Sequence, residues 1–243
     1  MEYYLKTLSN IEEFITDFKK DVYEMFKDET YNPIGTTYFI TGSKRESLDM
    51  LQQIISIIDV FGIDVLDRNK KGFENWLEII EYPPRLFKWD DINKFFENIL
   101  SVFQMAKEEL NEKINLLEEE ERERLNEAFN CYIQELNYSA IVMSVSAIEN
   151  RLFSLMISKY YDKRLEELTL GQLIWEYTHN KEKYGNIIPE KHEPLLDYCN
   201  IYRVFSVHPK KEKINRSNTT AILCMSCSFL FDKNMKTKTE KTS

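Results

Sequence analysis

The sequence predicts a mainly α-helical protein with a compact helical bundle in its C-terminal half. The 243 residues include only 6 glycines and 6 prolines, which are too few turn residues for a many-stranded β sandwich or barrel. Apolar side chains recur at helical spacing along most of the chain. Hydrophobic residues make up 43% and charged residues 30%, a composition typical of a globular protein that buries a sizeable core.

Residues 1–119 are expected to form an acidic, mostly helical N-terminal region of unknown role. Residues 36–41 (TTYFIT) have the β-branched and aromatic composition of a strand, so a short strand element is left open in this region. Ser43 and Glu46 have the spacing of a capping box, which predicts a helix that starts there. Further helices are expected over 11–27, ahead of Pro83, over 90–125 and over 125–161.

Residues 120–235 are expected to form a bundle of four or five helices, followed by a polar, basic tail over 236–243. The segment 140–157 is apolar almost all round, which predicts a helix at the centre of the bundle. A charge run, Glu118–Arg124, precedes it and is expected to be a solvated helical face or connector at the domain boundary.

Several classes of protein are excluded by what the chain lacks. The first residues show no basic segment followed by an apolar stretch, so no secretory signal is expected. The longest strongly apolar run, Ala221–Phe231, is shorter than the roughly 20 residues of a membrane span. The 4 cysteines have no regular spacing, which fits reduced thiols and a cytoplasmic location.

The net charge of −9 argues, as an average, against a nucleic-acid ligand. The average hides an asymmetry, because residues 1–130 carry a net charge of −12 and residues 131–243 carry +3. From Arg203 to the C-terminus the net charge is +6. The basic residues nearest to Arg203 are candidates for binding RNA phosphates: Lys210, Lys211, Lys213 and Arg216.

Arg203 and His208 form the pair that is best suited to chemistry. Five positions on a regular helix separate two side chains by about 140°. Pro209 forces the helix to end before it, which frees His208 to turn back toward Arg203. Such a pair suffices to cut RNA without a metal, because histidine transfers protons near neutral pH and a guanidinium binds phosphate. The RNA 2′-hydroxyl is the nucleophile.

No metal or other cofactor is expected. His192 lacks the second histidine of a zinc-binding helix, and His179 lies in a polar stretch typical of a surface. Cys224 and Cys227 form an isolated Cys-x-x-Cys inside an apolar helix, which is better explained by buried core thiols than by zinc or redox chemistry.

The segment Leu196–Pro209 resembles the signature of the HEPN superfamily, in which an arginine, four to six residues and a histidine end a late helix of an α bundle. The stretches Glu127–Phe129, Tyr138–Ile141 and Ala147–Leu152 are similar to the early helices of that family. The resemblance covers about residues 120–235 and does not extend to the first half of the chain.

The resemblance implies a metal-independent endoribonuclease that pairs its Arg/His motifs across a homodimer interface. Arg203 would bind the scissile phosphate, His208 would transfer protons, and Glu149 would support the site. Family members commonly act as toxins or antiviral defence effectors, so an antitoxin or regulatory protein is an expected partner.

Two alternatives remain open. The residue after the arginine is often polar in the family and is Val204 here, which favours a non-catalytic module that binds RNA, a nucleotide or a protein. The second alternative is a helical adaptor protein in which the spacing of the arginine and the histidine is accidental.

Overall fold

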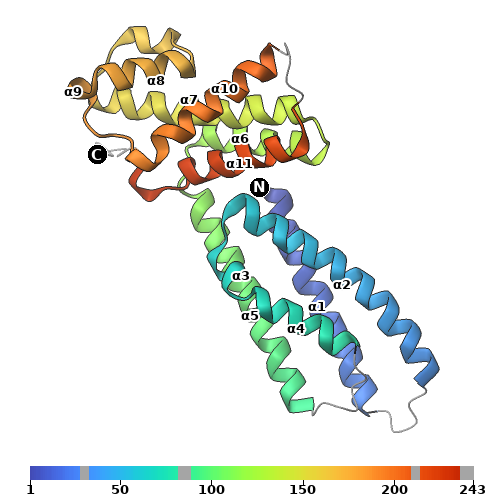
Figure 1. Cartoon of the computed structure of the whole chain (residues 1–243). Coiled ribbons are helices and arrows are strands. Elements are labelled where there is room, and N and C mark those ends of the chain that lie inside the picture. Colours follow the sequence, from blue (N-terminus) through green and yellow to red (C-terminus); the bar gives the residue numbers. More distant parts are fainter. Residues whose placement is uncertain (28–32, 82–88, 209–213, 236–243) are drawn as a thin grey trace. The chain divides into compact units, whose positions relative to one another are not determined.

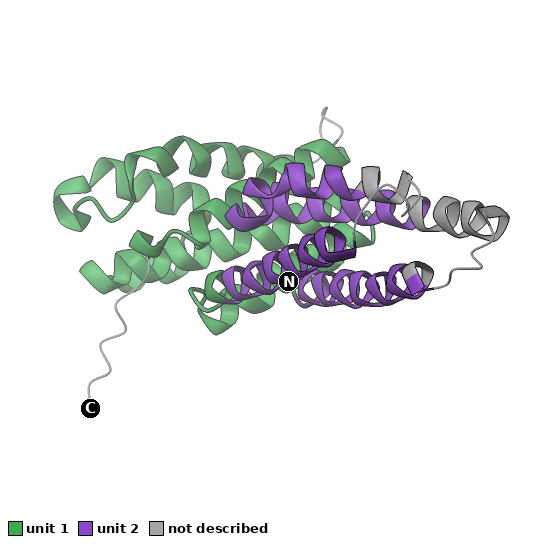
Figure 2. Ribbon diagram, turned by 90° about the horizontal axis from the view of Figure 1, so that it is seen from below, with its two compact units in different colours: residues 1, 112–243 green, residues 2–111 purple. Residues whose placement is uncertain are grey.

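The computed structural model describes residues 1–27, 33–81, 89–208 and 214–235, and every regular element in these ranges is a helix (Figure 1). The predicted mainly α-helical fold is therefore confirmed. The chain divides into two compact units, which we call the N-terminal unit (residues 2–111) and the C-terminal unit (residue 1 with 112–243) (Figure 2).

The N-terminal unit is built on aromatic packing between helices. The ring of Phe18 lies 5.9 Å from that of Phe96 and 6.4 Å from that of Trp76, and Phe73 lies 5.6 Å from Phe103. These contacts join three helices of the unit around one apolar core. Its helices are α1 (Glu2–Lys27), α2 (Pro33–Phe61), α3 (Asp64–Arg68), α4 (Lys70–Glu81) and α5 (Trp89–Ile114), whose last residues cross into the other unit.

The short strand left open over residues 36–41 is wrong, because these residues belong to α2. Pro33 is the first residue of α2, a position where its fixed φ angle and missing N–H favour a helix. Ser43 consequently lies inside a helix and does not begin one. These six residues are helical despite their strand-like composition. A lone strand has no partner for its backbone hydrogen bonds, whereas each residue added to a helix gains one.

The long helices expected over 90–125 and 125–161 are each interrupted. The first break precedes α6 (Glu119–Ile133), where the carboxylate of Glu121 accepts a hydrogen bond from the Glu118 N–H at 2.9 Å. The second follows α6, where Glu135 adopts a left-handed φ of 62° and Leu136 N–H donates to Cys131 O at 2.8 Å. This is a Schellman ending, in which glycine is the usual residue.

The C-terminal unit is organised around α7 (Asn137–Lys159), which contacts α6, α8, α10 and α11 (Figure 1). This confirms the expected central helix of a bundle. Residues buried along α7 include Ile141, Val145, Ile148 and Leu152. The other helices are α8 (Leu170–His179), α9 (Lys181–Tyr184), α10 (Glu193–Val207) and α11 (Arg216–Leu230), with 3₁₀ turns η2 (Lys163–Glu167), η3 (Glu190–His192) and η4 (Lys233–Met235).

Helix α7 is also the one described helix that is long and apolar enough to cross a membrane. Of the most apolar 18-residue segment of α7, 56% is buried inside the structure. Its position between α6, α8, α10 and α11 accounts for that apolar character as core packing.

A buried ion pair ties α7 to α6. Arg151 is 1% exposed and Glu121 is 0% exposed, and Arg151 Nε donates to Glu121 Oε1 at 2.6 Å. Arg151 Nη2 donates to the other carboxylate oxygen of Glu121 and, at 3.0 Å, to Leu116 O. Arg151 Nη1 donates to Met235 O at 3.0 Å and to Leu230 O at 3.4 Å. Every nitrogen of the guanidinium is thus satisfied. The prediction that Glu118–Arg124 is a solvated charge run is wrong for Glu121, which is buried.

We predict that Arg151→Met lowers the free energy of unfolding by about 3–5 kcal/mol, because it leaves the Glu121 charge buried without a partner. Urea unfolding followed by circular dichroism measures this loss. Arg122→Met on α6 is the control, because Arg122 is exposed and its loss is expected to change stability by at most about 0.5 kcal/mol. Equal stability of the two variants would contradict a structural role for the ion pair.

Candidate functional site at the end of α10

Helix α10 ends where the sequence predicts. Its last residue is Val207, and His208 follows as the C-cap with φ −130° and ψ 69°, outside the α region, as the residue before a proline should be. The His208 N–H donates to Val204 O at 2.9 Å, which closes the last turn. Arg203 therefore lies in the last helical turns and His208 just beyond them.

The side chains of Arg203 and His208 are both uncommitted. Arg203 is half-buried, and its Nε is fully buried without a hydrogen-bond partner, a state that costs about 1–3 kcal/mol. His208 is exposed. Neither side chain forms a hydrogen bond or ion pair with any residue in the described ranges, nor do the two bond to each other. Within one chain the pair is available but not assembled.

The surface of α10 around this pair is apolar. Ile201, Val204 and Val207 recur at every third position and are 48%, 40% and 48% exposed. Of the residues of α10, Leu196 and Cys199 are the buried ones. A helix of a packed bundle normally buries such a stripe, so this face of α10 has no packing partner among the residues that the structure describes.

An aromatic cluster lies on another side of α10. The rings of Tyr198 and Tyr202 lie 4.8 Å apart, and those of Tyr202 and Phe205 lie 5.9 Å apart. The Asn218 side chain of α11 donates to the Tyr202 hydroxyl at 3.0 Å. The three rings all belong to α10, and the hydrogen bond from Asn218 joins this side of the helix to α11.

Glu149, the expected supporting residue, holds α8 in place. Its Oε2 accepts a hydrogen bond from the Leu170 N–H at 2.8 Å, so the carboxylate occupies the positive end of the α8 dipole. The next residue of α8, Gly171, faces α10: a Cβ atom there would lie 3.0 Å from Nδ2 of Asn200. Glu149 is thus connected to α10 through the start of α8 and forms no hydrogen bond with Arg203 or His208 in the described residues.

The expected phosphate-binding lysines Lys210, Lys211 and Lys213 lie outside the described residues. Arg216 is described, and its guanidinium lies 3.3 Å from the ring centre of Tyr132 and donates to the Tyr132 carbonyl. Arg216 is exposed, and its guanidinium also joins the start of α11 to the end of α6.

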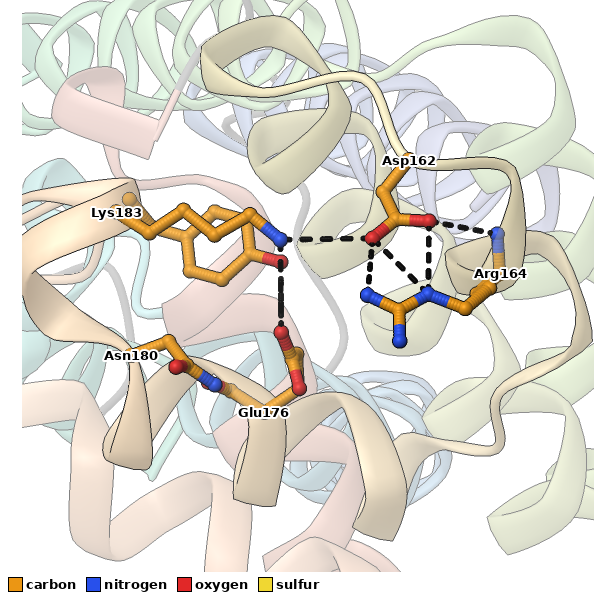
Figure 3. Close-up of polar contacts among 6 residues, drawn as sticks. Asp162, Arg164, Glu176, Asn180 and Lys183 are labelled. Atoms are coloured by element: carbon orange, nitrogen blue, oxygen red, sulfur yellow. Dashed lines mark hydrogen bonds and ion pairs between the residues drawn. The ribbon is translucent and has the colours of Figure 1, made fainter.

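A polar cluster between η2 and α9 escaped the sequence analysis (Figure 3). Asp162 accepts hydrogen bonds from the Arg164 side chain at 2.7 Å and from the Arg164 N–H at 3.0 Å, and these hold the pKa of the Asp162 carboxyl well below its usual range. Lys183 lies 3.5 Å from Asp162 and 3.7 Å from Glu176, which accepts from the Tyr184 hydroxyl at 3.1 Å. Each charge in this cluster is paired with an opposite one, so the cluster has a structural role: it joins η2 to α8 and α9.

An exposed aromatic pair on α8 was also missed. The rings of Trp175 and His179 are stacked with centroids 4.4 Å apart, and Trp175 is 59% exposed. His179 is exposed, as its polar surroundings in the sequence predict. An exposed aromatic face of this kind is suited to stacking on a nucleic-acid base.

His192, at the start of α10, is 2% exposed and lies 3.0 Å from Asp232 through its Nε2. Lys191 lies 2.6 Å from the same carboxylate, and the Asn234 N–H donates to it at 3.0 Å. Burial raises the pKa of the Asp232 carboxyl, but these hydrogen bonds outweigh burial and hold that pKa well below its usual range. The cluster locks the beginning of α10 to the residues after α11.

The described residues contain no group of three or more His, Cys, Asp or Glu side chains that could hold a metal ion. Cys227 is buried and Cys224 is half-buried, and neither forms a disulfide bond. Burial raises the pKa of the Cys227 thiol, so this sulfur stays protonated.

No protein-family model, curated protein or solved structure matches the chain. The residues of α10 and their surroundings are therefore the features that point to a function.

We predict that Asp232→Asn destabilises the protein at pH 7 and that its effect shrinks below about pH 4. The carboxyl has a lower pKa folded than unfolded, so its contribution is present above the unfolded value and lost as pH falls through the folded value. Urea unfolding between pH 7 and pH 2 measures the difference. Asp197→Asn, at an exposed position of α10, is the control. A difference from wild type that stays constant over this pH range would contradict the prediction.

Proposed function

We propose that this protein is a metal-independent endoribonuclease of the HEPN type. The observation that carries the proposal is the uncommitted pair of Arg203 and His208 at the end of a late helix of an α bundle. A structural arginine in the same unit, Arg151, has every nitrogen satisfied. The Nη atoms of Arg203 bond to no described residue, so they are available to an external anion.

The chemistry needs only these two side chains and the substrate. Arg203 binds the scissile phosphate through its Nη atoms and stabilises the charge that develops there. The 2′-hydroxyl attacks the adjacent phosphorus and the bond to the 5′-oxygen breaks, leaving a 2′,3′-cyclic phosphate and a 5′-hydroxyl end. His208 transfers the protons, since imidazole both accepts and donates near neutral pH.

A second copy of the chain would complete the site. The exposed stripe of Ile201, Val204 and Val207 runs along the same last turns of α10 that carry Arg203, and pairing two such stripes buries apolar surface in both copies. This pairing brings two Arg/His motifs to one interface. It also gives the apolar Val204 a role as an interface contact at a position that is often polar in the family.

The proposed setting is the cytoplasm, where the protein would act as a toxin or an antiviral defence effector. An RNase of this kind must be restrained, so an antitoxin or regulatory protein is the proposed partner.

The second candidate is a non-catalytic module that binds RNA or a nucleotide. The exposed stack of Trp175 on His179 favours this candidate, because an exposed aromatic ring can stack on a nucleic-acid base and bind it without cleaving the strand. The same experiments separate the two candidates.

We predict that the purified protein cleaves single-stranded RNA in the presence of EDTA. His208→Ala and Arg203→Ala are each expected to lower the rate by at least about 100-fold, since each removes a proton-transfer or charge-stabilising group. Gel analysis of a labelled RNA, with identification of cyclic phosphate ends, measures cleavage.

Arg122→Ala is the matched control, because Arg122 is an exposed arginine outside this site, and it should cleave like wild type. Equal cleavage by wild type, His208→Ala and Arg203→Ala would assign the activity to a contaminant and reject the proposal. RNA binding without strand scission would favour the non-catalytic module.

We predict that the wild-type protein is a homodimer and that Ile201→Glu converts it to a monomer with lower RNA cleavage, because a charge would be buried at the interface. Light scattering measures the mass, 29.1 kDa for one chain. Ile133→Glu, at a partly exposed position at the end of α6, is the matched control and should remain dimeric. A wild-type monomer at every concentration would contradict the composite site.

A further inference from the structure

We propose that Asn200 is a positioning residue that orients Arg203 by accepting a hydrogen bond from its Nε–H. The inference deepens the proposed function, because it names the group that aims the phosphate-binding arginine. It rests on that function only for its effect on cleavage, since the orientation of Arg203 can be measured without RNA.

Two buried atoms of complementary character carry the inference. Among the described residues, Oδ1 of Asn200 is a buried acceptor without a hydrogen-bond partner, and Nε of Arg203 is a buried donor without one. The two residues are three positions apart on α10, so their side chains project from the same face of the helix. We infer that a rotation within the flexible arginine side chain joins them, because one hydrogen bond would then satisfy both atoms.

The neighbouring helix holds the amide of Asn200 in place. A Cβ atom at Gly171 would lie 3.0 Å from Nδ2 and 3.2 Å from Oδ1 of Asn200, so the amide packs directly against the start of α8. The start of α8 is itself fixed by the hydrogen bond from the Leu170 N–H to Glu149. A chain of contacts therefore leads from Glu149 through Gly171 to Asn200.

Pairing at Nε also suits the chemistry of the guanidinium. The Nε atom of Arg203 is buried, so a phosphate cannot reach it without rearrangement of the protein. A hydrogen bond from Nε to Asn200 leaves both Nη atoms to bind a phosphate through two parallel hydrogen bonds. Asn200 acts through Arg203 and need not touch the substrate.

The test measures the Nε–H group of Arg203 by ¹⁵N NMR on the full chain without RNA, with the resonance assigned from Arg203→Lys. We expect Asn200→Ala to speed exchange of this proton with water at least about fivefold. A hydrogen bond of about 1 kcal/mol net strength protects a proton from exchange by about this factor. Asn200→Asp keeps an acceptor of the same size and should protect the proton at least as well as wild type. Unchanged exchange in Asn200→Ala, or faster exchange in Asn200→Asp, would overturn the inference.

Asn186→Ala is the matched control, because Asn186 is an exposed residue of the C-terminal unit away from α10. Its Arg203 Nε–H should exchange as in wild type. If Asn200→Ala does not fold, the comparison of Asn200→Asp with wild type decides the question, since that variant preserves the size of the side chain.

Cleavage of RNA supplies the second readout. We expect Asn200→Ala to lower kcat, Asn200→Asp to restore it, and Asn200→Ala to have no further effect in an Arg203→Ala background. An equal loss in both backgrounds would overturn the positioning role. If wild type does not cleave RNA, the proposed function fails, and the exchange of the Arg203 Nε–H still decides the inference about Asn200.

Discussion

The C-terminal unit depends on one buried ion pair. Arg151 lies in the middle of the central helix, and a guanidinium can stay charged there only because the carboxylate of Glu121 and three backbone carbonyls accept all its hydrogen bonds. Those acceptors come from α6, from the turn before it and from the residues that end the described chain. A single side chain thereby joins α7 to the start of α6 and to the end of α11 and the residues after it.

With α7 fixed at the centre, α10 is left at the edge of the bundle. One side of α10 is fastened to α11 by the Tyr202–Asn218 hydrogen bond, and its first turn is locked by His192 and Asp232. No described residue packs over the remaining side, so Ile201 and Val207 stay exposed. The surface that supports dimerisation is a consequence of how the bundle is closed.

The two arginines of this unit illustrate how structural and functional polar groups differ. Arg151 is wholly buried and fully bonded, whereas Arg203 is half-buried and unbonded within the described ranges. A fold keeps an unsatisfied polar group at a cost, so such a group is informative where it stands beside an exposed histidine. The basic excess of the sequence from Arg203 onward agrees with an anionic ligand at this end of the unit.

The sequence by itself determined the helical class, the central position of α7 and the end of α10 at Val207, because periodicity and proline act locally. Only the tertiary structure decided that residues 36–41 join α2 and that Glu121 is buried, since the partner of Glu121 lies 30 residues away. The same holds for the site. The spacing of Arg203 and His208 was visible in the sequence, but the orphaned Nε, the exposed stripe and the place of Asn200 depend on what packs against α10.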